Sequence, residues 1–273
     1  MELNNRWERA LINTVLVVGG FLVALPFFWM VLSSFKNENE VLSIPPTLFP
    51  LEPTFTNYIE LFTNLNFDVY LINTLIIVAF SMIGLLFNTM AGYGFGKFEF
   101  KRKEMWFAVV LVTMMIPGQV TMIPTYLILN QAGLTNTMAG IVLPGLIAAF
   151  NIFLIRQFMV TIPDDLIEAA RLDGAGEFYI FFKLIIPLAK PILAVQVILT
   201  FIGSWNSFLW PLIVANDESL YTLSVGLALL QDQNVTNYGL QMAGSTFMVL
   251  PIIIVFVVFQ KYIVEGFNVS GIK

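Results

Sequence analysis

Residues 161–191 read TIPDDLIEAARLDGAGEFYIFFKLIIPLAKP and lie between two long stretches of the chain that carry almost no charge. Asp165 and Glu168 stand three residues apart, which is the spacing of a capping box at a helix start. Gly174 is typical of a helix end, and a second short helix is expected from Glu177. The segment therefore predicts two short helices joined at a glycine, and we call it the elbow (residues 161–191).

The second half of the elbow predicts an amphipathic helix that ends near Pro187. Its apolar residues recur at i, i+3, i+4 and i+7, a single stripe formed by Phe178, Phe181, Phe182 and Ile185. Five acidic and two basic residues between Asp164 and Lys183 give a net charge of −3. A helix resting on anionic lipid headgroups would carry positive charge, so this balance favours docking against a protein. The lipid-bound alternative stays open.

The composition of the whole chain is that of a membrane protein. Of its 273 residues 58% are hydrophobic and 11% charged, with a mean hydropathy of +0.83, whereas soluble proteins are typically ~25% charged. Cys and His are absent, which excludes disulfides, thiol or imidazole nucleophiles and the usual nitrogen and sulfur metal sites. The formal net charge of −5 disfavours a nucleic-acid partner. We expect an all-α membrane protein without a metal site.

Six membrane-spanning helices are expected, because a span needs about 20 mostly apolar residues. They are predicted at residues 11–35, 69–96, 106–128, 138–155, 191–215 and 242–262. Prolines within the spans are predicted to kink them, namely Pro26, Pro117, Pro144 and Pro251. The predicted organisation is an N-terminal segment with the first span and an external loop (1–68), a five-helix core carrying the cytoplasmic loop 161–187 (69–262), and a C-terminal tail (263–273).

Basic residues predict the orientation in the membrane. With these spans, twelve of the 13 Lys and Arg residues fall on one side, and Lys36 alone falls on the other. Because basic residues concentrate in cytoplasmic loops, both termini of this multi-pass membrane protein are predicted to be cytoplasmic. The first span is too long for the apolar region of a signal peptide and is expected to stay attached.

The predicted spans contain no ionisable residue in their interiors, which argues against self-contained proton coupling. No phosphate-binding loop G-x-x-x-x-G-K-[ST] occurs either, so any ATP would be hydrolysed by another chain. Uncharged polar residues instead recur on one face of two spans, which indicates either close helix packing or a pathway for a neutral solute. The pathway candidates are Ser81, Asn88, Gln119, Asn151, Gln196, Thr200, Ser204, Trp205 and Asn206.

The elbow resembles the EAA signature (EAA-x3-G-x9-I-x-L-P) of the permeases of ATP-binding-cassette (ABC) importers. The resemblance rests on Glu168-Ala169-Ala170, on Gly174, and on Leu184-x-Ile186-Pro187. In the last group Leu184 stands where the signature has Ile, and Ile186 stands where it has Leu. It extends over nearly the whole chain. The segments 116–117, 125–126, 201–211 (FIGSWNSFLWP), 221–223 and the C-terminal VEGFNVSGIK are similar to the six-span, maltose-type subunits of the carbohydrate-uptake branch.

That resemblance implies a type I ABC importer permease fold and a transporter subunit rather than an enzyme. The implied partners are a second, different permease, two ATPase subunits that hold ATP and Mg, and an extracytoplasmic solute-binding protein. It implies coupling contacts to the ATPase from Glu168, Ala169, Ala170, Arg171, Asp173, Gly174 and Pro187. It also implies a tail contact to the ATPase from Gly266, Gly271 and Lys273. In the maltose case the sugar is held mainly by the other permease.

The function expected is inward transport of a neutral sugar or oligosaccharide by alternating access, with energy passed through the elbow. An importer of glycerol-phosphate or another polar solute is the nearest alternative. A stand-alone secondary transporter or channel, and a membrane-embedded enzyme or scaffold, are further alternatives. The paired acids Asp164 and Asp165 are the local candidate for an enzyme site, and helix capping explains them better.

Overall fold

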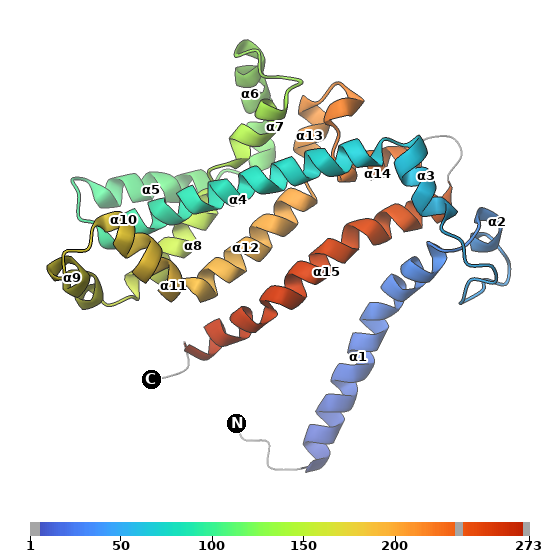
Figure 1. Ribbon diagram of the computed structural model, residues 1–273, viewed down its shortest axis with the longest axis horizontal. Helices are drawn as coiled ribbons and strands as arrows, with labels where there is room; N and C mark the ends of the chain where they lie inside the picture. The colour runs from blue at the N-terminus through green and yellow to red at the C-terminus, as the bar shows by residue number, and fades with distance from the viewer. Residues whose placement is uncertain (1–5, 233–236, 270–273) are drawn as a thin grey trace. The chain divides into compact units, whose positions relative to one another are not determined.

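The computed structural model describes residues 6–232 and 237–269, and these residues form helices without any strand (Figure 1). The all-α prediction is confirmed. The chain divides into two compact units: one takes the described part of Met1–Phe67 together with Leu227–Leu250, and the other takes Asp68–Gly226 together with the described residues from Pro251 onwards.

The first unit contains one long apolar helix and the loop that follows it. Helix α1 (Arg6–Ser33) continues through Pro26, and the short helices α2 (Glu38–Val41) and α3 (Thr56–Asn64) come after it. Lys36 is buried in this loop, where its Nζ donates to the Thr47 carbonyl and lies 4.6 Å from the centre of the Trp29 ring. The carbonyl and the ring thus compensate a charge that would be costly to bury alone. The unit also takes the first part of α15 (Tyr238–Val269).

The second unit is built around α4 (Phe67–Lys97). Its further elements are α5 (Lys103–Met114), α6 (Gly118–Gln131), α7 (Met138–Val142), η1 (Leu143–Gly145), α8 (Ala149–Val160), α9 (Asp164–Leu172), α10 (Glu177–Tyr179), η2 (Ile180–Ile185), α11 (Ile186–Leu188), α12 (Lys190–Trp205), α13 (Leu209–Val214) and η3 (Glu218–Leu220). Helix α14 (Leu223–Asp232) begins in this unit, and its residues from Leu227 onwards belong to the first unit. Helix α8 packs against both α5 and α12.

Glycines bring α4 and α8 into close contact. A Cβ atom on Gly92 would lie 2.7 Å from Cγ2 of Ile155, and one on Gly96 would lie 2.7 Å from Cβ of Met159. These two glycines are one turn apart, so they present the same face of α4 to α8. Small residues at such positions allow membrane helices to pack backbone to backbone.

Two of the predicted spans are broken at proline. The kink predicted at Pro117 in the span 106–128 is confirmed, and it is sharp, because α5 and α6 meet at an angle of 101°. Pro117 lacks an N–H group and disfavours helical backbone at the residue before it, which explains the break. Pro144 lies in η1, between α7 and α8. In the described residues five segments are long and apolar enough to cross a membrane, and counting the bent pair α5–α6 as one span gives six.

Candidate functional site

The first helix of the elbow, α9, is held at its start by an ion pair. Lys97 at the end of α4 donates from Nζ to Oδ1 of Asp164 at 2.7 Å and also to the carbonyl of Ile162. The lysine side chain is 3% exposed and the aspartate 72%. The hydrogen bond and the charge of Lys97 hold the pKa of Asp164 below its ordinary value. The ion pair thus connects α4 to the elbow.

The predicted capping role of the acids is wrong. The residue before α9 is Pro163, and no side chain accepts a hydrogen bond from the first turn. Asp164 and Asp165 instead occupy the first turn of the helix, where a carboxylate is favourable next to the positive end of the helix dipole. A proline at the cap offers no side-chain acceptor, so the capping box predicted from Asp165 and Glu168 does not form.

Helix α9 ends in a Schellman motif at Gly174. The N–H of Ala175 donates to the Ala170 carbonyl, and the N–H of Gly174 donates to the Arg171 carbonyl, both at 3.0 Å. Gly174 has a φ of +82°, a left-handed conformation that glycine adopts without strain. The glycine predicted to end this helix is therefore required by the backbone geometry.

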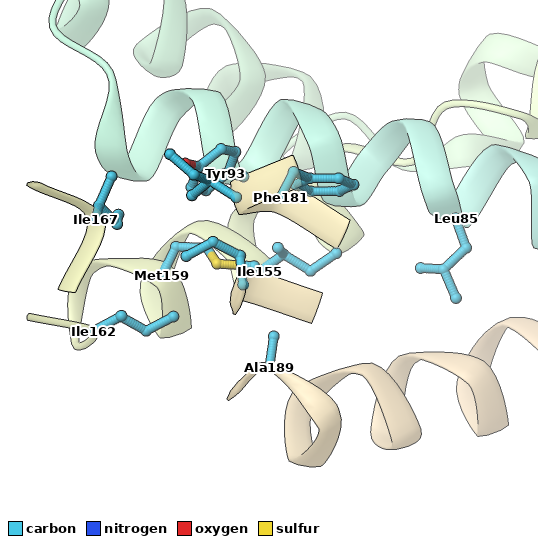
Figure 2. Close-up of a cluster of buried hydrophobic side chains, with 10 residues drawn as sticks. Leu85, Tyr93, Ile155, Met159, Ile162, Ile167, Phe181 and Ala189 are labelled. Atoms are coloured by element: carbon cyan, nitrogen blue, oxygen red, sulfur yellow. The ribbon is translucent and has the colours of Figure 1, made fainter. Parts of the chain in front are cut away.

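One face of the elbow is buried in an apolar cluster, which we call the elbow core. Its fully buried members include residues from α4, α8, α9 and the second half of the elbow: Leu85, Tyr93, Ile155, Met159, Ile162, Ile167, Ile180, Phe181, Ile185 and Ala189. Figure 2 shows Tyr93 and Phe181 close together, with Ile155 and Met159 beneath them. The rings of Tyr93 and Phe181 have their centres 5.5 Å apart.

The second helix of the elbow begins at Glu177 as predicted, but its apolar stripe differs from the prediction. Residues Ile180–Ile185 form a π-helix, in which hydrogen bonds join residues five apart. The wider turn buries Phe181 together with Ile180 and Ile185, whereas Phe178 and Phe182 are 71% and 47% exposed. The predicted stripe assumed ordinary α-helical spacing, so it includes two exposed residues, Phe178 and Phe182.

The opposite face of the elbow is exposed. Among the coupling residues inferred from the EAA signature, the exposed ones are Glu168, Ala169, Arg171, Asp173, Gly174 and Pro187, and Ala170 is half-buried. Arg171 donates from Nε to Glu177 at 2.7 Å, which links the two helices of the elbow. Of the inferred tail contacts, Gly266 falls within α15, and Gly271 and Lys273 lie outside the described residues.

A cavity of about 690 Å³ lies in the second unit, at the level of the α5–α6 and α7–α8 breaks. Its size is within the ~300–1,000 Å³ range of small-molecule sites. Its lining is entirely uncharged and comes from α4, α6, α7, η1, α8, α12, α13 and adjoining loops. The polar side chains in it belong to Ser81, Asn88, Gln119, Thr121, Thr125, Asn151, Thr200, Ser204, Ser207 and Trp210.

Six of the nine pathway candidates line this cavity: Ser81, Asn88, Gln119, Asn151, Thr200 and Ser204. The other three do not. Gln196 is completely buried and both atoms of its amide lack a hydrogen-bond partner. Trp205 is 2% exposed and stacks on Phe201 at 5.6 Å, and Asn206 is exposed and donates to the Ile202 carbonyl.

Asn88 holds the wall of the cavity together. Its Nδ2 donates to the Leu146 carbonyl at 3.3 Å and its Oδ1 accepts from the Ala148 N–H at 3.2 Å. Both groups belong to the irregular turn before α8, where backbone groups would otherwise lack partners. A Cβ on Gly84, one turn earlier, would lie 2.3 Å from the Leu146 oxygen. Asn88 and Gly84 together keep α4 packed against this turn.

Four polar cavity residues lie outside the candidate list, namely Thr121, Thr125, Ser207 and Trp210, and the last two belong to the polar residues of the predicted span 191–215. The two threonines lie on α6, which the bend at Pro117 turns away from α5. The proline was the available signal in the sequence, but the direction of the bend depends on packing. Trp210 lies at the start of the short helix α13, which the sequence did not separate from α12.

Comparisons with known proteins agree with this architecture. The sequence model of the protein family described as binding-protein-dependent transport system inner membrane component matches residues 88–269. The arabinooligosaccharides transport system permease protein AraQ of Halalkalibacterium halodurans is 34% identical, over 98% of this chain and 99% of that protein. The sn-glycerol-3-phosphate transport system permease protein UgpE of Brucella abortus is 29% identical, over 93% and 94%.

A solved structure has the same fold. The crystal structure of a bacterial ABC transporter involved in the import of the acidic polysaccharide alginate contains a chain with a TM-score of 0.83 and 26% identity. The match covers 96% of this chain and 100% of that chain. This protein therefore belongs to the family of binding-protein-dependent transport system inner membrane components and is a membrane-spanning permease subunit of an ABC importer, not an enzyme.

Proposed function

We propose that this permease imports a neutral sugar or oligosaccharide by alternating access, and that the elbow receives the driving motion from an ATPase subunit. The observation that carries the proposal is the position of α4. The same helix is joined to the elbow through Lys97 and lines the uncharged cavity through Ser81 and Asn88. A displacement of the elbow would therefore act directly on the wall of the cavity.

The coupling contact is proposed for the exposed face of α9 and the turn that follows it. Glu168, Arg171 and Asp173 would meet the ATPase there, and Gly174 would set the shape of the turn. The tail residues Gly266, Gly271 and Lys273 would add a second contact. The complete transporter would contain two ATPase subunits holding ATP and Mg, a second permease and an extracytoplasmic solute-binding protein, and both termini of this chain would be cytoplasmic.

A neutral solute is favoured by the chemistry of the cavity. Its lining offers hydroxyl groups, amides and one indole ring but no charged side chain. An anion in such a site would lose its hydration without a compensating positive charge. The similarity to AraQ supports an oligosaccharide, and arabino-oligosaccharides are the first candidates. The similarity to UgpE favours glycerol-phosphate as the second candidate, with its counter-charge supplied by the other permease.

Reconstitution of the complete transporter into vesicles tests both parts of the proposal. Glu168→Lys should leave membrane insertion intact and lower ATP-driven uptake of arabinotriose by about tenfold or more, because a reversed charge opposes docking. The matched control is Glu99→Lys, an exposed acid outside the elbow whose side chain is 90% accessible. Uptake by the Glu168 variant at the control rate would refute the coupling role. Import of glycerol 3-phosphate, with no import of arabinotriose, would refute the neutral substrate.

A further inference from the structure

We propose that this chain itself holds one ring of the sugar, with Trp210 as the surface on which the ring stacks. The inference rests on the proposed import of a neutral saccharide and adds a binding subsite within this subunit. Trp210 is fixed in position, several cavity residues already hydrogen-bond within the protein, and the lining carries no charge.

Trp210 is held in place by contacts on one side and lines the cavity on the other. Its Nε1 donates to the Gly140 carbonyl at 3.2 Å, and the residue packs against the apolar cluster that contains Ile141 and Val214. Because the indole N–H already has a partner, the side chain has only its aromatic surface to offer a solute. A side chain fixed in this way loses little conformational entropy on binding.

The neighbouring tryptophan is a poor candidate for the same role. Trp205 is 2% exposed, stacks on Phe201 and is not part of the cavity lining. Trp210 is therefore the one tryptophan of the described cavity wall. The two residues form a natural comparison, because they lie five positions apart in the same predicted span and differ in access to the cavity.

Several polar groups in the cavity are already engaged with the protein. The hydroxyl groups of Thr121, Thr125 and Ser204 donate to carbonyls of their own helices, and Asn88 uses both ends of its amide. The donors of the three hydroxyl groups are consequently not free for a solute, and their oxygens keep acceptor capacity only. Asn88 keeps one of its two amide N–H groups.

Three lining residues keep their full hydrogen-bonding capacity. Ser81, Gln119 and Ser207 make no side-chain hydrogen bond to any part of the chain that the structure describes. Together they supply two hydroxyl groups and one amide. They come from α4, α6 and the loop before α13, so they approach the cavity from different sides.

This arrangement corresponds to the chemistry of a sugar ring. One face of a pyranose or furanose carries C–H groups, which pack on an aromatic surface, and its rim carries hydroxyl groups that donate and accept hydrogen bonds. Trp210 offers the apolar surface, and Ser81, Gln119 and Ser207 offer polar partners for the rim. A site of this kind, mostly apolar with a few polar groups that fix orientation, is typical of small-molecule recognition.

The test compares Trp210→Leu with Trp210→Phe in the complete transporter, reconstituted with its solute-binding protein and supplied with labelled arabinotriose. The leucine keeps apolar bulk and removes the aromatic face, whereas the phenylalanine keeps a ring. We expect Trp210→Leu to lower the number of sugars imported per ATP hydrolysed by about tenfold, equivalent to about 1.4 kcal/mol. Trp210→Phe should stay within about twofold to threefold of the wild type. Trp205→Phe is the control and should be unchanged.

Each outcome has a defined meaning. Wild-type import per ATP by Trp210→Leu would overturn the subsite and leave the proposed function intact. Equal losses in Trp210→Leu and Trp210→Phe, together with loss of the ATPase activity that the binding protein stimulates, would reveal a structural role and also overturn it. Failure of the wild-type transporter to import arabinotriose and a second neutral probe, lactose, would overturn the proposed function, and the subsite would fall with it.

Discussion

Replacement of Gly174 tests whether the shape of the elbow matters for coupling. The φ of +82° at this position is unfavourable for any residue with a Cβ atom, and no other atom lies within 4 Å of the place where that Cβ would be. The cost of Gly174→Ala is therefore conformational and not steric, about 1–2 kcal/mol. Gly174→Pro should cost more, because proline fixes φ near −65° and removes the N–H that donates to Arg171.

This cost translates into a change in the population of the folded elbow. One or two kcal/mol alters the ratio of an ordered to a disordered segment by a factor of about 5–30. If the ordered elbow is the form that docks, Gly174→Ala should reduce uptake per ATP by at most that factor. Gly174→Pro should uncouple transport almost completely. Gly174→Asn should lie closest to the wild type, because asparagine tolerates the left-handed conformation better.

The assay is uptake and ATP hydrolysis measured in the same reconstituted vesicles. Gly176→Ala is the matched control, since Gly176 has a φ of −74° and open space around it. It should behave as the wild type. The backbone geometry alone predicts that uptake per ATP decreases from Gly174→Asn through Gly174→Ala to Gly174→Pro. Equal uptake per ATP in the Pro variant and the Gly176 control would refute the reasoning, provided that both proteins reach the membrane in equal amounts.

Two further predictions concern the helices around the elbow. Because the pKa of Asp164 is lowered, its pair with Lys97 contributes stability above the ordinary carboxyl pKa of 3.8 and loses it as the pH falls through the lower folded-state value. The difference in Tm between the wild type and Asp164→Asn should be constant from about pH 8 to about pH 5 and disappear in strong acid; a loss near neutral pH would contradict this. Gln196→Leu should raise the Tm of the purified protein without lowering uptake, since it removes a buried amide without partners, at a cost of about 1–3 kcal/mol. A lower uptake with unchanged Tm would contradict this and indicate that Gln196 contributes to the solute pathway.

The elbow shows which features could be predicted from the sequence. The glycine that ends α9 was predictable, because a left-handed helix end demands that residue type. The helix spanning Ile180–Ile185 was not, since its i+5 hydrogen bonds leave no mark in the apolar spacing. The capping prediction failed because α9 begins earlier than expected, so that Pro163 stands at the cap and Asp165 lies within the first turn.

The cavity shows a different limit. Gln196, Thr200 and Ser204 share one face of α12, as their spacing predicts, yet only the latter two reach the cavity. The reason is position along the helix axis. Gln196 lies one turn nearer the elbow, where the neighbouring Leu193 and Val197 pack against the elbow core. Helical periodicity defines a face but not where along that face a cavity begins.

The contacts of α4 suggest how the two sites communicate. Near the elbow, Gly92 and Gly96 allow α4 to pack so closely against α8 that a side chain on either glycine would clash. At the cavity, the contact passes through the hydrogen bonds of Asn88 to an irregular turn. Packed helices transmit a displacement as rigid bodies, whereas hydrogen bonds to a turn can exchange partners. Under the proposed coupling, a motion of the elbow would act on the cavity through both kinds of contact, and the ATPase could drive it only if it contacted the elbow differently in its two nucleotide states.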